Sequence, residues 1–341
     1  MVINKKEIKN ILLTAVEKAQ GNKIDYQQLY NAKERFSAEN EFLFFIKPEI
    51  TMNSPGIKFD LILEMLFVQL DKFGLIPTDM RVLSANYVKK YNIIAQHYGI
   101  INNVSVSPLS NMTDDARERF KSLTGKNINK AKVLGSLEVT GRIPGFSPSS
   151  LDYVWQNVKT EKLAGGTYLA KVFIDGEEVY IINGFHPRQL EHYVQPGRCI
   201  ITMTLTGDLS WKEARNAFIG VTNPKDAMPG SLRNILLQNR ILFGLQLVSS
   251  SWNGFHLSAG PVEGIVELIR YTSDFSKNHI CSYTDFSFGK MLAARFGDET
   301  IRKIISNTSM DVDGKMISVF DLTEEKNSCE AMDILEKYIT T

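Results

Sequence analysis

The sequence predicts an α+β protein in which helices cover one antiparallel sheet. Short apolar runs of strand length alternate with segments of helical period, first over 42–97 and again over 187–271. With 341 residues, the chain is long enough for two domains or for one domain with large insertions. Two βαβ-like halves sharing an antiparallel sheet give a ferredoxin-like plan.

The first half of this plan begins after a helical segment. Apolar residues recur at helical spacing within 4–36, which predicts an amphipathic helix that packs on the core or on a partner subunit. A strand, a helix, a strand and a second helix follow at 42–46, 56–73, 77–83 and from 85 to about 97. Gly74 is a good stop for the first of these helices, and Ser84 can cap the second.

The second half repeats the pattern. The expected elements are a helix at 187–194, a strand at 200–205, a helix at 211–219, a strand at 251–255 and a helix at 261–271. His256 follows the last strand, and Pro261 suits the first turn of the last helix. Glu267 lies about two turns into that helix, on the face that can look back at the histidine.

Residues 99–183 interrupt the two halves and have structure of their own. Helices are expected at 113–123 and 151–158, and 140–149 reads as loop. Strands at 167–174 and 178–182 flank Asp175-Gly176, a strong hairpin signal. We therefore expect an inserted α+β subdomain. It either only stabilises the fold or forms a lid that faces the substrate. The tail after 275 carries helices near 297–306 and 327–338.

Composition excludes several classes of function. The formal net charge of +1 favours no nucleic-acid or membrane surface. The three cysteines show neither metal spacing nor a disulfide framework, and no run is long enough for a membrane span. The first ten residues are charged where a signal peptide needs an apolar core, so we expect a cytoplasmic protein. Neither a Walker phosphate-binding motif nor a dinucleotide glycine fingerprint is present.

The segment 215–267 carries the candidate chemistry. Its loop contains Thr222 and is flanked by Arg215 and Arg233, and guanidinium groups bind phosphate oxygens in a forked geometry. A carboxylate such as Glu267 near His256 would fix which ring nitrogen carries the lone pair, and a neutral imidazole can then attack phosphorus. Taken alone, the loop reads as an ordinary turn and the histidine as a surface residue.

Together these pieces resemble the nucleoside diphosphate kinase family. GVTNPKDAMPGSLR (220–233) matches the family loop G-x-T-N-P-x-x-x-x-P-G-x-[IL]-R, and NGFHLSAG (253–260) matches the active-site strand N-x-x-H-G-S-D at Asn253, His256 and Ser258. Glu267 has the family's spacing, eleven residues after the histidine. Three further motifs are FLFFIKPE with Lys47 and Pro48, AQHYG with His97 and Tyr98, and GFHPRQLEHYV with Phe185, Leu190 and Tyr193.

The resemblance covers less than half of the chain and implies a domain plan. The expected parts are an N-terminal helical extension at 1–40, a nucleoside diphosphate kinase-like core at 41–98 and 184–275, the inserted subdomain at 99–183 and a C-terminal helical extension at 276–341. A homo-oligomer is compatible with the resemblance.

The resemblance also implies a reaction. A nucleoside triphosphate would give its terminal phosphate to His256, and a nucleoside diphosphate would then take it. Mg²⁺ would bridge the phosphates, held mainly by them and by water, so no metal-ligating residues are expected. The implied roles are orientation of the imidazole by Glu267 and Ser258, positive charge from Lys47, Arg215 and Arg233, a phosphate contact from Thr222, a sugar contact from Asn253, a pocket wall at Tyr98 and base stacking on Phe185.

The sequence departs from the family beside the histidine. Leu257 and Ala259 replace the family's Gly and Asp, and Arg215 lies one residue too far from Thr222. Two alternatives therefore stay open. One is a diverged phosphoryl or nucleotidyl transferase whose acceptor is presented by the insertion, and the other is a non-catalytic nucleotide-binding protein.

Overall fold

A computed structural model of the chain describes residues 5–32 and 38–339. The chain divides into two compact units, Met1–Tyr91 with Pro196–Thr341, and Asn92–Gln195. Each unit combines helices with a mainly antiparallel sheet, so the α+β class is confirmed. The second unit extends beyond the predicted insertion at 99–183 on both sides in the sequence, so it includes Tyr98 and Phe185.

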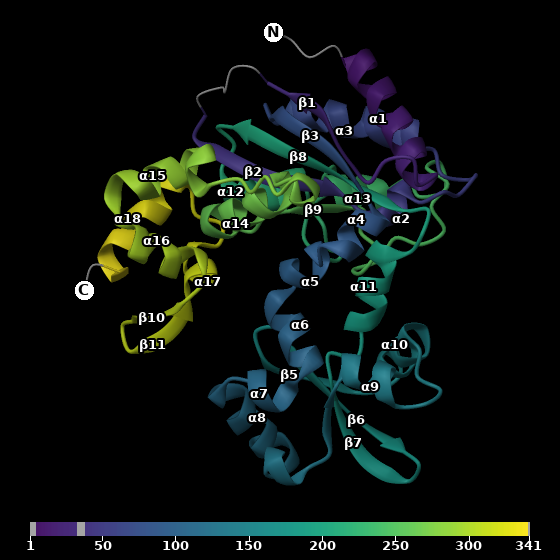
Figure 1. Ribbon diagram of the computed structural model, residues 1–341, viewed down its shortest axis with the longest axis vertical. Coiled ribbons are helices and arrows are strands. Elements are labelled where there is room, and N and C mark those ends of the chain that lie inside the picture. The colour runs from purple at the N-terminus through teal and green to yellow at the C-terminus, as the bar shows by residue number, and fades with distance from the viewer. Residues whose placement is uncertain (1–4, 33–37, 340–341) are drawn as a thin grey trace. The chain divides into compact units, whose positions relative to one another are not determined.

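The first unit is built on a five-stranded sheet (Figure 1). Its strands are β1 (Tyr26–Asn31), β2 (Asn40–Ile46), β3 (Ile76–Ser84), β8 (Cys199–Gly207) and β9 (Phe255–Leu257). Their order is β1-β3-β8-β2-β9, and every neighbouring pair is antiparallel. The predicted strands at 42–46, 77–83 and 200–205 are confirmed as the central strands β2, β3 and β8.

One face of this sheet packs against helices to form the main core. Phe42, Phe44 and Ile46 alternate along β2 toward this face, as a period of two requires, and they pack with α1 and α3. The helices of the first unit before the C-terminal extension are α1 (Lys5–Gln20), α2 (Pro48–Thr51), α3 (Phe59–Lys72), α4 (Ala85–Lys90), α12 (Trp211–Glu213), α13 (Leu232–Gln238) and α14 (Pro261–Thr272).

The N-terminal helix is shorter than the sequence predicts. The apolar stripe of α1 is confirmed, but the helix ends at Gln20, and the following Asn22 has a φ of 54° that breaks helical geometry. Residues 26–31 then form β1, which pairs with β3 at the edge of the sheet. Residue 4 and residues 33–36 of the predicted helix lie outside the described residues.

The other face of the sheet carries α14 and the C-terminal extension. The rings of Phe45 on β2 and Tyr271 on α14 are 5.2 Å apart. Gly260 lies so close to α17 that a Cβ there would be 2.5 Å from the carbonyl oxygen of Thr323. The extension consists of α15 (Ser287–Arg295), α16 (Asp298–Ile305), the hairpin β10 (Ser309–Val312) and β11 (Lys315–Ser318), α17 (Val319–Thr323) and α18 (Ser328–Ile339). Its two predicted helices correspond to α16 and α18.

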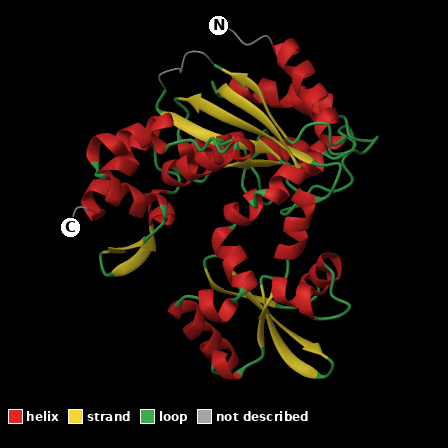
Figure 2. Ribbon diagram, in the orientation of Figure 1, coloured by secondary structure: helices red, strands yellow, loops and turns green. Residues whose placement is uncertain are grey.

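The second unit has a four-stranded sheet of its own, with helices around it (Figure 2). Its strands are β4 (Val133–Gly135), β5 (Thr160–Ala164), β6 (Thr167–Ile174) and β7 (Glu177–Ile182). The predicted hairpin is confirmed, because Asp175 and Gly176 join β6 to β7 with φ values of 52° and 80°. Its helices are α5 (Ile93–His97), α6 (Gly99–Val106), α7 (Pro108–Asn111), α8 (Asp114–Thr124), α9 (Ser136–Arg142), α10 (Pro148–Gln156) and α11 (His186–Val194).

The helix expected from 85 to about 97 is interrupted. Ser84 caps α4 as predicted, since its hydroxyl accepts a hydrogen bond from the Tyr87 N–H at 3.1 Å. Asn92 then has a φ of 53°, which separates α4 from α5. The chain passes from the first unit to the second at this break.

Across the described residues, no helix combines the length and the apolar character that a lipid bilayer crossing requires.

A buried histidine makes the second unit sensitive to acid. The side chain of His186 is fully buried, with Nε2 3.2 Å from Oδ1 of Asn102, and burial lowers its pKa to about 4. The unfolded chain binds a proton below its ordinary pKa of about 6.5, whereas the folded chain does so only near 4, so stability falls as pH falls through this window. We expect this unit to lose about 2 kcal/mol of stability between pH 7 and pH 5.

Amide hydrogen exchange in β6 and β7 at the two pH values measures this loss. In a His186→Gln variant the pH dependence should flatten, because glutamine does not titrate. An unchanged pH dependence in the variant would assign the effect to other groups.

Candidate functional site

His256 occupies the middle of β9, whereas the sequence predicts a strand that ends just before it. Residues 249–254 form a turn that ends at Gly254, whose φ is 80° and where a Cβ would lie 2.4 Å from Cδ2 of Leu236. The strand therefore starts only at Phe255, and His256 pairs with Phe45 of β2. The two rings stack at a centroid distance of 4.4 Å, which restricts the imidazole orientation.

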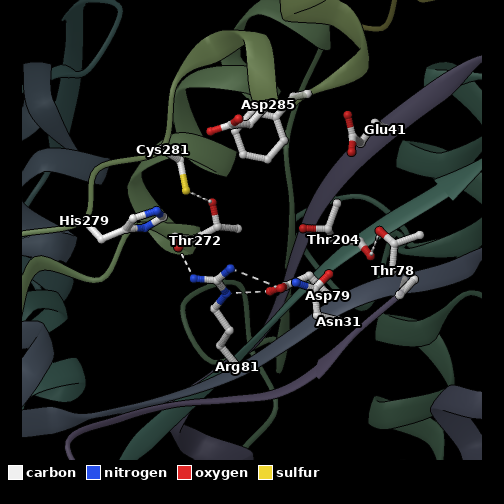
Figure 3. A pocket seen from close by; sticks show the side chains of 12 residues that line it. Asn31, Glu41, Thr78, Asp79, Arg81, Thr204, Thr272, His279, Cys281 and Asp285 are labelled. Atoms are coloured by element: carbon white, nitrogen blue, oxygen red, sulfur yellow. Dashed lines mark hydrogen bonds and ion pairs between the residues drawn. The ribbon is translucent and has the colours of Figure 1, made fainter. Parts of the chain in front are cut away.

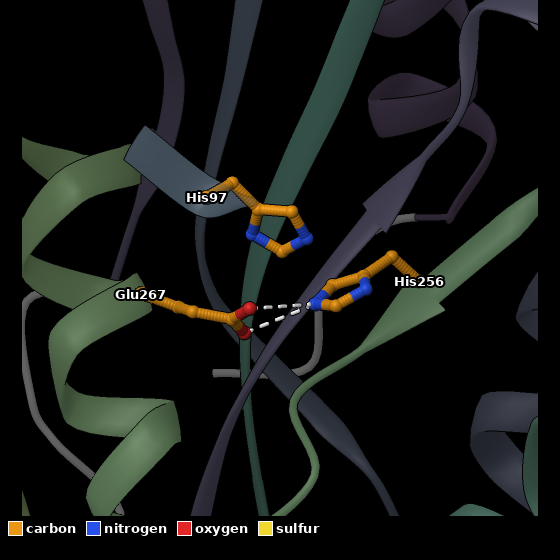
Figure 4. A group of neighbouring side chains, drawn as sticks. All are labelled: His97, His256 and Glu267. Carbon is orange, nitrogen blue, oxygen red and sulfur yellow. Dashed lines mark hydrogen bonds and ion pairs between the residues drawn. The ribbon is translucent and has the colours of Figure 1, made fainter. Parts of the chain in front are cut away.

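A buried carboxylate faces this imidazole. Nε2 of His256 lies 3.0 Å from both carboxylate oxygens of Glu267 on α14 (Figure 4). The Glu267 side chain is 2 % exposed and that of His256 is 17 % exposed. An ionised carboxylate only accepts hydrogen bonds, so the proton is on Nε2 and the in-plane lone pair is on Nδ1.

A second carboxyl group lies one helical turn before Glu267. Burial and the nearby Glu267 raise the pKa of Glu263, while Arg215 opposes that shift. Glu263 therefore gives up its proton less readily than an exposed carboxyl group. Glu263 is not among the predicted site residues, although its spacing of four residues from Glu267 places it on the same helix face.

Lys47 follows β2 and precedes α2, which begins with Pro48. Its ammonium group donates to Oδ1 of Asn253 at 2.7 Å, and the residue is 8 % exposed. Burial lowers the pKa of Lys47 to about 8, with Glu49 opposing the shift and Arg233 adding to it. A Glu49 oxygen accepts from the Gly254 N–H at 2.8 Å, so the segment after β2 is tied to the segment before β9.

Asn253 links Lys47 to the loop. Its amide group donates to the carbonyl oxygens of Thr222 and Ser250 at 3.0 and 3.1 Å, and the residue is 1 % exposed. The family resemblance implies that Asn253 contacts a sugar. In this structure its side chain instead joins Lys47 to the loop, while Thr222 itself is exposed.

Arg233 holds the other end of the loop. It lies on α13, is 5 % exposed, and donates to the carbonyl oxygens of Gly220 and Phe255 at 2.8 and 2.9 Å. Gly220 has a φ of 87°, and a Cβ there would lie 2.5 Å from Oγ of Ser231. The two ends of the loop 220–231 therefore lie close together, and Arg233 connects the loop to β9, the strand that carries His256.

This arrangement predicts a structural cost for Arg233→Ala. Two buried carbonyl groups lose a charged donor, so the free energy of unfolding should fall by about 2 kcal/mol. Denaturant titration measures the change, with Arg240→Ala as the matched control, because Arg240 lies just beyond the same helix and is exposed. Equal stability of the two variants would show that the Arg233 contacts contribute little.

Two further predicted site residues, Ser258 and Arg215, also differ from expectation. Ser258 is expected to orient the imidazole, but its buried hydroxyl lies 3.2 Å from both the backbone nitrogen and the carbonyl oxygen of Leu43, where it anchors β9 to β2. Arg215 lies in a π-helical turn, Ala214–Phe218, where a plain helix was expected. It donates to the Leu257 carbonyl oxygen at 3.2 Å and is 3.5 Å from Oε1 of Glu324 in the C-terminal extension.

Tyr98 and Phe185 belong to the second unit. The Tyr98 ring meets the His186 ring at a near-perpendicular angle with 6.0 Å between centroids. The Phe185 ring lies 5.9 Å from that of Trp155 and 6.0 Å from that of Tyr168. The eight other predicted site residues all lie in the first unit: Lys47, Arg215, Thr222, Arg233, Asn253, His256, Ser258 and Glu267.

Comparison with known proteins finds similarity at the level of solved structures, and the similarity is weak. No model of a known protein family and no curated protein matches the sequence. Among solved structures, the crystal structure of an NDP kinase from Pyrobaculum aerophilum is similar at 14 % identity and a TM-score of 0.35, covering 70 % of this chain and 98 % of that one. A similarity this weak leaves the function to be inferred from the residues of the site.

Proposed function

We propose that the protein transfers a phosphoryl group from a nucleoside triphosphate to a nucleoside diphosphate through a phosphohistidine at His256. The observation that carries this proposal is the 3.0 Å contact between Nε2 of His256 and Glu267. With Nε2–H donated to the carboxylate, Nδ1 is the nitrogen that can act as nucleophile.

The strand arrangement supports a nucleoside diphosphate kinase-like core. The four strands β3-β8-β2-β9 lie in the order of a ferredoxin-like sheet, with α3 between β2 and β3 and helices between β8 and β9. The loop at 220–233 and the segment at 253–260, which carry the sequence resemblance, are joined in this unit through Arg233 and Asn253.

In the first half-reaction, Nδ1 of His256 would attack the terminal phosphorus in line with the bridging oxygen. The new P–N bond forms from the Nδ1 lone pair, and the electrons of the broken P–O bond leave with the nucleoside diphosphate. The phosphorylated ring, still protonated at Nε2, then carries positive charge, which Glu267 stabilises. The second half-reaction reverses these steps with another nucleoside diphosphate as acceptor.

Positive charge around the transferring group would come from Lys47, Arg215 and Arg233, with a hydroxyl contact from Thr222. Asn253 would act by holding Lys47, to which it is hydrogen bonded at 2.7 Å. The nucleotide contacts expected of Tyr98 and Phe185 rest on the resemblance alone.

Mg²⁺ fits this site as a partner of the nucleotide. Two carboxylates of the site are engaged, Glu267 with His256 and Glu49 with the Gly254 N–H. The ion would therefore be held by phosphate oxygens and water, with its preference for oxygen ligands satisfied. When bound, it supplies charge neutralisation between the phosphate groups.

Nucleotide exchange tests the proposal. ATP and a second nucleoside diphosphate are supplied, and formation of the second triphosphate is followed with both concentrations varied. Parallel double-reciprocal lines, the mark of a ping-pong mechanism, are expected. A phosphoenzyme that is not discharged by any nucleoside diphosphate would favour another acceptor, and nucleotide binding without phosphoenzyme would favour a non-catalytic protein.

Activity should decline in alkaline solution because of Lys47. Burial lowers its pKa to about 8, so the ammonium cation that would contact phosphate is lost as pH rises through that value. We expect kcat/KM to fall above pH 8. The pH profile of a Lys47→Met variant should lack this limb, and persistence of the limb would assign it to another group.

A further inference from the structure

A polar cavity of about 230 Å³ lies in the first unit, between the sheet and the start of the C-terminal extension (Figure 3). Its floor is formed by β2, β3, β8 and the end of β1, and its wall by residues 272–286. The proposed phosphoryl transfer assigns it no role. The volume corresponds to about eight water molecules at roughly 30 Å³ each, which leaves room for a small organic molecule.

The floor contains a buried hydroxyl group. Thr204 on β8 is 4 % exposed, and its side chain lines the cavity. Within the described residues its Oγ1 atom has no hydrogen-bond partner. Buried hydroxyl groups usually have a hydrogen-bond partner, so this hydroxyl at the cavity wall is available to a group bound in the cavity.

Two carboxylates face the same space. One oxygen of Glu41 on β2 accepts from the N–H and hydroxyl of Ser287 at 2.7 and 2.8 Å, at the beginning of α15. One oxygen of Asp285 accepts from the Ser282 N–H at 2.8 Å. Each side chain is thereby held in position and keeps a second oxygen as a hydrogen-bond acceptor.

The positive charge of Arg81 in the lining is already neutralised by an ion pair with Asp79. Arg81 is the only Lys or Arg side chain among the described lining residues, and it forms a bidentate pair with Asp79 at 2.5 and 3.0 Å. Its remaining hydrogen bonds go to the Thr272 carbonyl oxygen and the Tyr26 hydroxyl. Among the described residues, neither Glu41 nor Asp285 has an ion-pair partner, so the cavity has an excess of negative charge and of acceptors.

We propose that this cavity binds a small organic cation, a primary amine or guanidinium group on a short chain. The donors of the cation would satisfy Glu41 and Asp285, and the Thr204 hydroxyl would accept a further N–H. An anion is disfavoured because Arg81 is neutralised by Asp79. The described lining provides no convergent set of three metal-ligating side chains, which favours an organic cation over a metal ion.

Titration of the full-length protein with agmatine and putrescine tests this site. Isothermal calorimetry at low ionic strength should give saturable binding with one site, weakened by added salt. Inorganic phosphate and glycerol, the anionic and neutral controls, should not bind there. Saturable phosphate binding that depends on Thr204 would overturn the assignment of a cation.

Matched variants locate the binding. Thr204→Val removes the hydroxyl at constant shape and should weaken agmatine binding about tenfold, the loss expected for one hydrogen bond to a charged group. Thr202→Val is the control, because Thr202 lies on the same strand, is also buried without a described hydrogen-bond partner, and does not line the cavity. Its affinity should equal that of the wild type.

A second variant tests the site independently in case Thr204→Val does not fold. Asp285 is exposed, so Asp285→Asn should fold normally and should also weaken agmatine about tenfold. Nucleotide exchange should be unchanged in both cavity variants. Failure of both cations to bind the wild type, or wild-type affinity in both Thr204→Val and Asp285→Asn, would show that the cavity holds only water.

Discussion

Replacing His256 by alanine should abolish phosphoenzyme formation and lower nucleotide exchange by at least about 10³-fold. The imidazole is the group that would bond to phosphorus, so its removal deletes the proposed nucleophile. Nucleotide affinity should change little, because the imidazole contributes bonding only during transfer. Labelling with γ-labelled ATP and equilibrium binding of ADP measure the two effects separately.

The control for this variant is His279→Ala, since His279 is also in the first unit and is exposed. It should label like the wild type. Undiminished labelling of the His256→Ala protein would refute the assignment of the nucleophile.

Replacing Lys47 by methionine should lower kcat by about 10²-fold, the scale for losing one preorganised electrostatic donor. Methionine approximates the length of the lysine stem, and a buried cation is costly to maintain, so the fold should survive the change. The released Oδ1 of Asn253 is the main structural cost, since it loses a hydrogen bond of 2.7 Å.

Steady-state kinetics of Lys47→Met are to be compared with those of Lys58→Met, which alters an exposed lysine of the same unit. An effect confined to KM, with kcat unchanged, would indicate nucleotide binding without a role in transfer. That outcome would favour the non-catalytic alternative.

Strong local signals made the central fold predictable. The uninterrupted apolar run of β2 and the Asp175-Gly176 turn each have one dominant structural interpretation, and both were placed correctly. The strand at 26–31 was missed because it is an edge strand with a mixed burial pattern, which periodicity does not separate from helix. The break at Asn92 was missed because asparagine adopts a positive φ only occasionally. No glycine beside it marks the break in the sequence.

One contact of the candidate site was predictable from the sequence, and the others were not. The spacing of His256 and Glu267 placed a carboxylate within reach of the imidazole, and the structure has them 3.0 Å apart. The hydrogen bonds of Asn253 and Ser258 depend on backbone carbonyl and N–H groups of distant segments, which a sequence pattern does not specify. Arg215 and Glu324 are brought together only by the packing of the C-terminal extension.

The position of the phosphate on the imidazole ring tests the proposed mechanism most directly. The protein is labelled with ¹⁵N-histidine, phosphorylated with ATP and studied by ³¹P–¹⁵N correlation spectroscopy, which distinguishes the two ring nitrogens. Because Nε2 of His256 faces Glu267 at 3.0 Å, the phosphorus should couple to Nδ1. Coupling to Nε2, or a phosphoenzyme whose phosphorus is not bonded to histidine, would contradict the mechanism.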